Sequence, residues 1–226
     1  MKKFNKLFII LLCLVGAMSV TSCLNSDGDG GIDPETYKAW LSAMYGPYYG
    51  SSSDYRYQNK IFYYYDDEEE NKIKTDSILG VVVNINSLDT AFTVSNATGR
   101  VLAKQIPDTY KDLRDALESY DQPISINGKF DFTGISQNAY FTIYNTSATI
   151  NNLEYGGETH DITVAFWGYP YSSGAYGRMG EYDIIEIYLC LGAIFVDDSQ
   201  TPLFEYPISS QADLTKATLF LRATRQ

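Results

Sequence analysis

Residues 148–167 read ATINNLEYGGETHDITVAFW, and this stretch decides the fold class. Two short segments, 148–155 and 161–167, alternate apolar with polar residues and are separated by Gly156-Gly157. A period of two is typical of a half-buried β-strand, and Gly-Gly between two such segments is typical of a tight hairpin turn. The stretch therefore predicts two strands joined by a short turn.

Similar short segments occur along most of the chain, which indicates that strands dominate the fold. Clusters of Asn, Asp and Gly separate them, and one of these, Asn127-Gly128, is a typical hairpin-turn dipeptide. Beyond the two segments above, we predict strands at 54–65, 77–85, 90–95, 124–132, 140–144, 182–196, 203–206 and 217–223.

The sequence predicts two helices. The first begins at Asp33-Pro34-Glu35, with an N-cap Asp and a proline in the first turn, and ends at Gly46-Pro47. Its apolar face carries Tyr37, Trp40, Leu41 and Met44. The second spans 109–120, where Thr109 and Asp112 resemble a capping box, and its apolar face carries Tyr110, Leu113, Leu117 and Tyr120.

Helical crossovers are too few for a parallel α/β sheet. We therefore expect a mainly β (α+β) fold, either an antiparallel sandwich or an open barrel, with two short helices.

The N-terminus has the pattern of an export signal. Lys2, Lys3 and Lys6 precede an apolar stretch from Leu7 to Met18, which is shorter than the ~20 residues of a spanning helix. The stretch ends in Val20-Thr21-Ser22-Cys23, which resembles the processing site of bacterial lipoproteins. We predict that residues 1–22 are removed and that the thiol of Cys23 is acylated.

This anchor predicts the protein's location and its first partner, the membrane. Residues 23–33 would form a flexible tether and residues 34–226 a single β-rich domain. The acidic residues just after Cys23 resemble the signal that sends Bacteroidetes lipoproteins to the outer cell surface. We expect an outer-membrane protein, on the cell surface in preference to the periplasmic face.

Composition excludes several partners and sites. The net charge is -11, which opposes nucleic acid, and processing would remove three lysines and no acid. With a single histidine, His160, no site can be built from two imidazoles. We expect no metal site, no cofactor and no catalytic residue.

Three features offer weaker chemical alternatives. We interpret His160 as a hydrogen-bonded residue at a strand end, because no Gly-x-Ser-x-Gly elbow presents a nucleophile for a triad. Cys190 lies in an apolar segment and is expected to be a buried thiol, not a nucleophile. Paired carboxylates could support glycoside hydrolysis, and the acids available are Glu154, Glu158, Glu181, Asp183 and Glu186.

The 20 tyrosines give the best indication of function, because many fall in two segments rich in Gly and Ser, 45–57 and 168–177. Tyr, Ser and Gly together are typical of antibody-like binding loops, and aromatic rings stack on sugars. Tyrosine is also frequent in ordinary β-proteins. Our candidate ligand-binding residues are Trp167, Tyr169, Tyr171, Tyr176, Tyr48 and Tyr49.

Two surface features complete the list. Ser77 and Thr90 match the short Asp-Ser/Thr-apolar pattern of Bacteroidetes O-glycosylation. The acidic segment 66–71 is interpreted as a solvated turn, with weak attraction of divalent ions as the alternative.

One resemblance covers much of the chain. Residues 153–166, LEYGGETHDITVAF, are similar to the central hairpin of a Bacteroidetes lipoprotein family classed as a domain of unknown function. The segments 100–104, RVLAK, and 191–197, LGAIFVD, fit the same family. The resemblance implies an envelope lipoprotein and supplies no catalytic residue.

From these observations we expect a cell-envelope lipoprotein that acts as a non-enzymatic binding module for a glycan or a protein. A structural or accessory envelope subunit is the alternative. A carboxylate-dependent glycoside hydrolase is a third, less favoured possibility.

Overall fold

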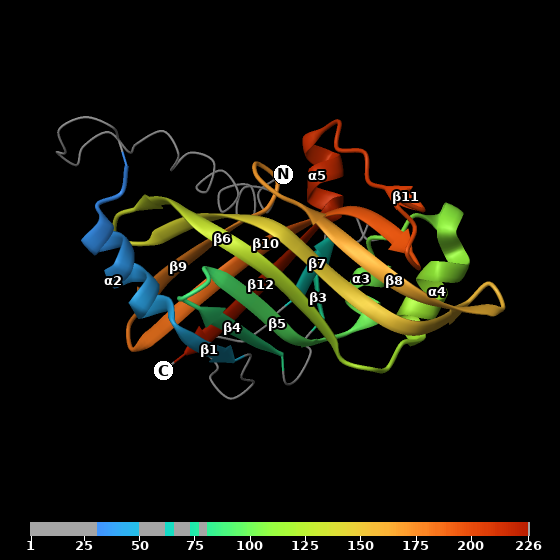
Figure 1. The fold of residues 1–226 in the computed structure, drawn as a ribbon, viewed down its shortest axis with the longest axis horizontal. Coiled ribbons are helices and arrows are strands. Elements are labelled where there is room, and N and C mark those ends of the chain that lie inside the picture. Colours follow the sequence, from blue (N-terminus) through green and yellow to red (C-terminus); the bar gives the residue numbers. More distant parts are fainter. Residues whose placement is uncertain (1–30, 50–61, 66–72, 77–80, 226) are drawn as a thin grey trace.

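The computed structural model describes residues 31–49, 62–65, 73–76 and 81–225 (Figure 1). The predicted signal segment 1–22, Cys23, Ser77 and the acidic segment 66–71 lie outside the described residues.

The described residues form short helices and longer strands. Their order is α2 (Pro34–Met44), β1 (Gly46–Tyr49), β2 (Phe62–Tyr65), β3 (Ile73–Asp76), β4 (Val82–Asn86), β5 (Ala91–Ala97), α3 (Gly99–Ala103), the 3-10 helix η4 (Asp108–Tyr110), α4 (Lys111–Ser119), β6 (Ile124–Ile135), β7 (Ala139–Tyr155), β8 (Glu158–Trp167), β9 (Ser173–Met179), β10 (Tyr182–Val196), β11 (Phe204–Glu205), α5 (Gln211–Ala217) and β12 (Thr218–Arg225).

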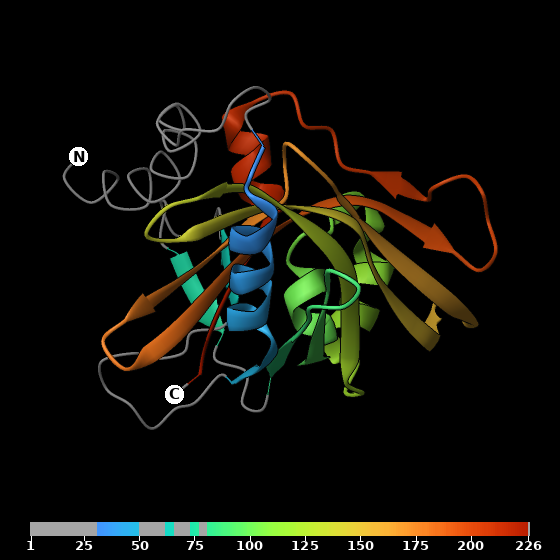
Figure 2. The same cartoon turned by 60° about the vertical axis from the view of Figure 1, so that its left-hand side comes forward.

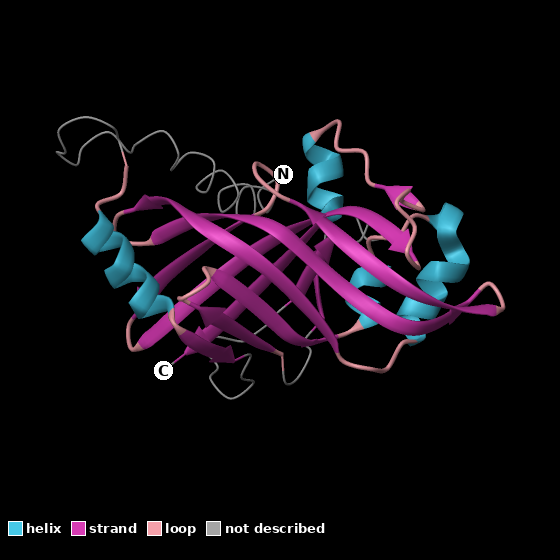
Figure 3. Ribbon diagram, in the orientation of Figure 1, coloured by secondary structure: helices cyan, strands magenta, loops and turns pink. Residues whose placement is uncertain are grey.

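Antiparallel pairing joins the main strands into a closed ring. The order is β10-β8-β7-β6-β5-β4-β1-β12, and β12 pairs back with β10. Figure 3 shows the result as two crossing layers of strands, with β5, β6 and β7 over β10 and β12. The mainly antiparallel β prediction is confirmed, and the described residues also contain two short helices, α3 and α5, that the sequence analysis did not predict.

The ring encloses one hydrophobic core. Along β6, buried and exposed residues alternate strictly from Ile124 to Gly134, as expected for a strand with one face inside. Helix α2 lies at one end of the sheet, and α3 with α4 lies at the other (Figures 1 and 2). Each helix adds buried side chains to the same core, among them Met44, Leu102, Leu113 and Leu117.

The helix predictions are confirmed except at one cap. The Asp33 carboxylate accepts a hydrogen bond from the backbone N–H of Thr36 at 2.9 Å, and α2 ends at Met44, before Gly46-Pro47. In contrast, α4 begins at Lys111 after the turn η4, and its N-cap residue, Tyr110, makes no side-chain capping hydrogen bond. The predicted box between Thr109 and Asp112 is therefore wrong, because the 3-10 turn takes up residue 109.

The strand predicted at 124–132 is confirmed as part of β6, and the interpretation of Asn127-Gly128 as a turn is wrong, because both residues lie within this strand. Phe92 of the neighbouring strand occupies the space where a side chain at residue 128 would project. A Cβ built there would lie 2.4 Å from Thr146 Oγ1 and 2.6 Å from two atoms of the Phe92 ring. Glycine is thus used for close packing at this position and not for a turn.

Two further predictions change in the structure. Residues 140–144 and 148–155 belong to one long strand, β7, which bends at Asn145, where φ is +49°. The tyrosine-rich segments are partly strands: residues 46–49 form β1, and residues 173–177 belong to β9. The Gly156-Gly157 turn between β7 and β8 is confirmed, with positive φ at both glycines.

A buried ion pair lies where the ring closes. Asp183 of β10 and Arg225 of β12 are partners in the register of these strands, and Arg225 Nη2 lies 2.7 Å from Asp183 Oδ2. The same guanidinium donates to the backbone carbonyls of Ala43 and Tyr45 at the end of α2. One side chain therefore connects the last strand, the closing strand and the N-terminal helix.

We predict that Gly128→Ala destabilises the protein by about 2 kcal/mol, because the added methyl group overpacks the core against Phe92. Urea unfolding followed by circular dichroism would measure the change. Ser125→Ala, at an exposed position of the same strand, is the control and should be close to neutral. Equal stability of Gly128→Ala and the wild type would contradict this account.

We predict that Asp183→Asn destabilises the protein by roughly 2 kcal/mol, since it leaves two guanidinium groups without their carboxylate. Burial raises the pKa of Asp183, but hydrogen bonds from Arg178 and Arg225 outweigh it, and the pKa falls below its ordinary value of 3.8. The unfolded chain therefore binds the proton first, and this stabilisation is lost as pH falls below about 4.

Thermal melts between pH 2 and 7 would show this dependence. The stability curve of Asp183→Asn should be flatter than that of the wild type below pH 4. Asp198→Asn, at an exposed turn, is the control and should follow the wild type. Parallel curves for the wild type and Asp183→Asn would contradict the prediction.

Candidate functional site

The structure separates the six candidate aromatic residues. Tyr48 is completely buried and Tyr176 nearly so, and both belong to the core. Tyr48 donates its hydroxyl to the carbonyl of Met44 at 2.9 Å, and its ring lies 6.3 Å from that of Tyr176. Their predicted place on a ligand surface is corrected: strand alternation turns both side chains inward beneath α2.

The remaining candidates are accessible. Tyr49 on β1 is 52% exposed, at a distance along the sheet from the others. Tyr169 is 64% exposed and Tyr171 36% exposed, both in the connection between β8 and β9. Trp167, the last residue of β8, is half-buried.

Trp167 and Tyr171 line one shared groove. It has a volume of about 440 Å³ and is completed by a segment distant in sequence; its lining residues are Trp167, Tyr171, Glu205, Tyr206, Pro207 and Ile208. We call it the Trp167 groove. The rings of Trp167 and Tyr171 lie 6.4 Å apart at 55°. The groove is open to solvent, and the two rings form part of its lining.

A β-bulge on β10 positions the indole. Leu191 pairs with Phe166 and Ala193 with Ala165, so Gly192 is the extra residue between them. A Cβ at Gly192 would lie 3.3 Å from Trp167 Cδ2, so glycine lets the indole lie close to the strand. The Gly192 carbonyl accepts from the N–H of Tyr206 at 2.7 Å, which holds the second wall of the groove in place.

Buried hydrogen bonds fix the Tyr171 side of the groove. The N–H of Tyr171 donates to the carbonyl of Gly168 at 2.9 Å, closing a turn after β8. The next residue, Ser172, is completely buried and accepts from the N–H of Cys190 at 2.9 Å through its hydroxyl oxygen. Tyr171 therefore projects from an anchored turn and not from a free loop.

The sequence predicted only part of the opposite wall of the groove, which residues 205–208 form. The segment 203–206 was predicted as a strand, and Phe204–Glu205 forms the short strand β11 beside β10. Phe204 packs between the rings of Tyr110, at 5.5 Å, and Tyr206, at 5.7 Å. Glu205 supplies the one charge among the lining residues, a carboxylate beside an aromatic surface.

His160 makes a hydrogen bond to Asp197, which follows β10. Its Nδ1 lies 3.0 Å from Asp197 Oδ2, and the other Asp197 oxygen accepts from the N–H of Asp161 at 3.0 Å. These hydrogen bonds hold the pKa of Asp197 below its ordinary value. The ring also lies 4.7 Å from Tyr155. The hydrogen-bonded histidine that we expected is confirmed.

Cys190 is buried, as expected, and burial raises the pKa of its thiol to about 12. Such a thiol is protonated at neutral pH and is a weak nucleophile. It lies in the closing strand, β10, with its backbone N–H bound to Ser172.

The candidate carboxylates lie at different parts of the sheet. Glu154 and Glu158 flank the β7–β8 turn, and Glu181 precedes β10. Asp183 and Glu186 are held by arginines, Glu186 by Arg222 at 2.5 Å. In the part of the chain that the structure describes, no three His, Cys, Asp or Glu side chains form a group that could hold a metal ion.

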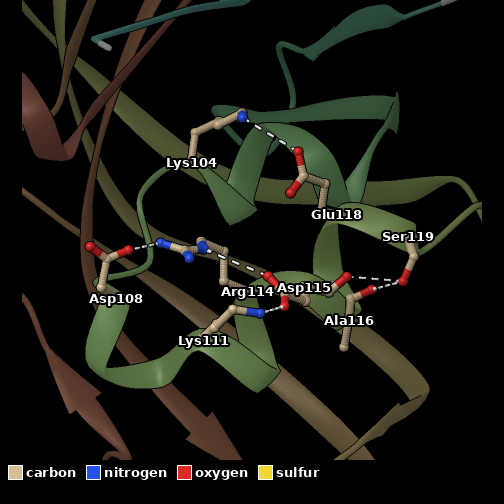
Figure 4. Close-up of polar contacts among 8 residues, drawn as sticks. All are labelled: Lys104, Asp108, Lys111, Arg114, Asp115, Ala116, Glu118 and Ser119. Carbon is tan, nitrogen blue, oxygen red and sulfur yellow. Dashed lines mark hydrogen bonds and ion pairs between the residues drawn. The ribbon is translucent and has the colours of Figure 1, made fainter. Parts of the chain in front are cut away.

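Charged side chains also gather around α4 (Figure 4). Arg114 pairs with Asp108, and Lys111 pairs with Asp115 one turn along the helix. Lys104 lies 3.4 Å from Glu118. The charges of these three pairs balance and most are solvent-exposed, so the pairs stabilise the helix surface only slightly.

Thr90 lies in the turn between β4 and β5, half-buried, with φ at +46°. Its carbonyl accepts from the N–H of Phe130 at 2.9 Å. O-glycosylation at Thr90 stays a prediction.

Comparison with known proteins gives the family. Residues 43–196 match the model of the family described as Domain of unknown function (DUF4840). The chain belongs to this family. The match includes Trp167 and Tyr171 but ends before Glu205, so one wall of the groove lies beyond it. No curated protein and no solved structure matches the chain.

Among the helices that the structure describes, none is long and apolar enough to cross a membrane.

Proposed function

We propose that this protein is a Bacteroidetes cell-envelope lipoprotein that binds a glycan, without catalysing a reaction, in the Trp167 groove. The observation that carries the proposal is the groove itself. It combines three aromatic side chains with one carboxylate in a volume of about 440 Å³. Aromatic rings provide a flat apolar surface for the C–H faces of a sugar, and the carboxylate of Glu205 can accept hydrogen bonds from sugar hydroxyls.

The fixed walls favour binding further. Trp167 lies against the Gly192 bulge, and Tyr171 projects from a turn held by buried Ser172. A site that is ordered before the ligand arrives loses little conformational entropy on binding. These residues come from strand ends and short connections, where ligand sites are frequently placed on a rigid scaffold.

The envelope location rests on the sequence. The basic start, the apolar stretch and Val20-Thr21-Ser22-Cys23 support acylation of Cys23. Acidic residues directly after the anchor support display on the outer surface. A tethered domain at the cell surface would meet polysaccharides before they are imported.

We predict that Trp167→Ala weakens glycan binding roughly tenfold, because the loss of one stacking surface removes on the order of 1.4 kcal/mol. A glycan array would first identify binding neutral oligosaccharides, and calorimetric titration would then compare the variants. Tyr171→Ala should also weaken binding. Tyr49→Ala, which removes a more exposed tyrosine outside the groove, is the control and should bind like the wild type.

Retained affinity in the Trp167→Ala, Tyr171→Ala double variant would overturn the binding site. An absence of any glycan binding by the folded wild type would overturn the glycan proposal and favour an accessory role in the envelope.

We predict that Cys23→Ala abolishes lipid attachment and leaves the leader uncleaved, since the thiol is the acylated atom. Growth with an alkyne-labelled palmitate, followed by fluorescent tagging and gel analysis, would detect the modification. Cys13→Ala, within the discarded apolar stretch, is the matched control and should be labelled like the wild type. Label that persists in Cys23→Ala would contradict the anchor.

A further inference from the structure

A second groove lies beside α2, which Figure 1 shows at the left, away from β11 at the right. It has a volume of about 280 Å³ and is formed by α2, β9 and the turn between β6 and β7; its lining residues are Ala39, Trp40, Ala43, Gln137, Tyr176 and Arg178. We call it the Arg178 groove. It shares no lining residue with the Trp167 groove.

Arg178 is the one charged residue among those that line this groove, and it shares its carboxylate partner with a second arginine. Asp183 is shared by two arginines: Arg178 Nε lies 2.8 Å from Oδ1, and Arg225 Nη2 lies 2.7 Å from Oδ2. One carboxylate therefore faces two guanidinium groups. The pairing therefore leaves one of the two arginines without a carboxylate of its own.

The two arginines are not equivalent. Arg225 is mostly buried and also donates to the carbonyls of Ala43 and Tyr45 at the end of α2. Arg178 has a side chain that is 70% exposed, and Asp183 is its one ion-pair partner among the described residues. Arg178 donates to Asp183 through its Nε–H. The terminal amino groups of the same guanidinium can therefore donate to a ligand.

The other residues that line the groove are suited to contact with a planar ring of a ligand. Trp40 and Tyr176 meet edge to face, with centroids 5.8 Å apart, and the small side chains of Ala39 and Ala43 leave space beside them. Gln137 adds an amide that can donate or accept a hydrogen bond. Arg225 neutralises the partial negative charge at the end of α2, which would otherwise repel an anion.

We propose that the Arg178 groove binds the carboxylate of a ring-bearing ligand, with Arg178 holding the carboxylate and Trp40, packed edge to face on the buried ring of Tyr176, contacting the ligand ring. Guanidinium pairs with carboxylate through planar, charge-assisted hydrogen bonds, which gives both strength and orientation. This chemistry is shared by uronic acid residues of glycans and by free aromatic acids. The experiment separates these two sources.

The distribution of tryptophan allows a direct measurement. The chain has two tryptophans, and one lines each groove. Trp167→Phe in the full-length protein leaves Trp40 as the only indole, so its fluorescence reports the Arg178 groove alone. The probes are galacturonate with galactose as its uncharged counterpart, and phenylacetate with 2-phenylethanol as its counterpart.

We expect a saturable change of Trp40 fluorescence with at least one carboxylate and none with its uncharged counterpart. Arg178→Gln should weaken binding about tenfold or more, as expected for the loss of a charge-assisted hydrogen bond, and Arg178→Lys should weaken it less. Preference for galacturonate would identify an acidic glycan as the source, and preference for phenylacetate a free aromatic acid.

Arg222→Gln is the matched control, because it also breaks an arginine–carboxylate pair, with Glu186, but lies outside the groove. It should retain the wild-type affinity. If Arg178→Gln fails to fold, Gln137→Ala and Arg178→Lys carry the test. No carboxylate-dependent signal, or equal losses in Arg178→Gln and Arg222→Gln, would overturn the proposal and leave the Trp167 groove unaffected.

Discussion

The fold depends on the contact between β10 and β12, because this pairing closes the ring of strands. Asp183 and Arg225 face each other across this pair, at 2.7 Å, and Asp183 is nearly buried. A buried ion pair stabilises only when its remaining hydrogen-bonding groups find partners. Here Arg178 donates to the second carboxylate oxygen, and Arg225 also donates to the carbonyls of Ala43 and Tyr45 at the end of α2. The ring of strands and the N-terminal helix are therefore stabilised together.

Closure also decides where a ligand can bind. The inside of the ring is filled by large aromatic and aliphatic side chains, such as Phe92, Phe130 and Phe141, which leaves close packing at the centre. Binding surfaces must then lie where strands leave the core. The Trp167 groove occurs where β8 ends at a bulge of β10, and the Arg178 groove occurs where β9 runs out from beneath α2.

Much of the fold could be predicted from local patterns, because alternation and caps depend on neighbouring residues. Both predicted helices and most strands are confirmed. Asn127-Gly128 was misinterpreted because the reason for the glycine, the ring of Phe92, is distant in sequence. Helix α5 was missed although Ser210 accepts from the N–H of Asp213, a cap that the sequence contains. Trp167 and Tyr171 were predicted, but Glu205 and Tyr206 reach the groove only through pairing of β11 with β10.

The tyrosines show why composition alone could not locate a binding surface. Tyr176 and Arg178 are two residues apart on β9 and so share one face of the strand. Helix α2 covers Tyr176, whose hydroxyl lies 3.4 Å from the carbonyl of Ala43, whereas Arg178 lies beyond that cover and is exposed. On this face of β9, the side chain at 176 is buried and the side chain at 178, two residues later, is exposed. The groove lies at this step, because Arg178 is exposed beside α2 while Tyr176 is buried beneath it, and the number of tyrosines in the segment does not reveal this difference.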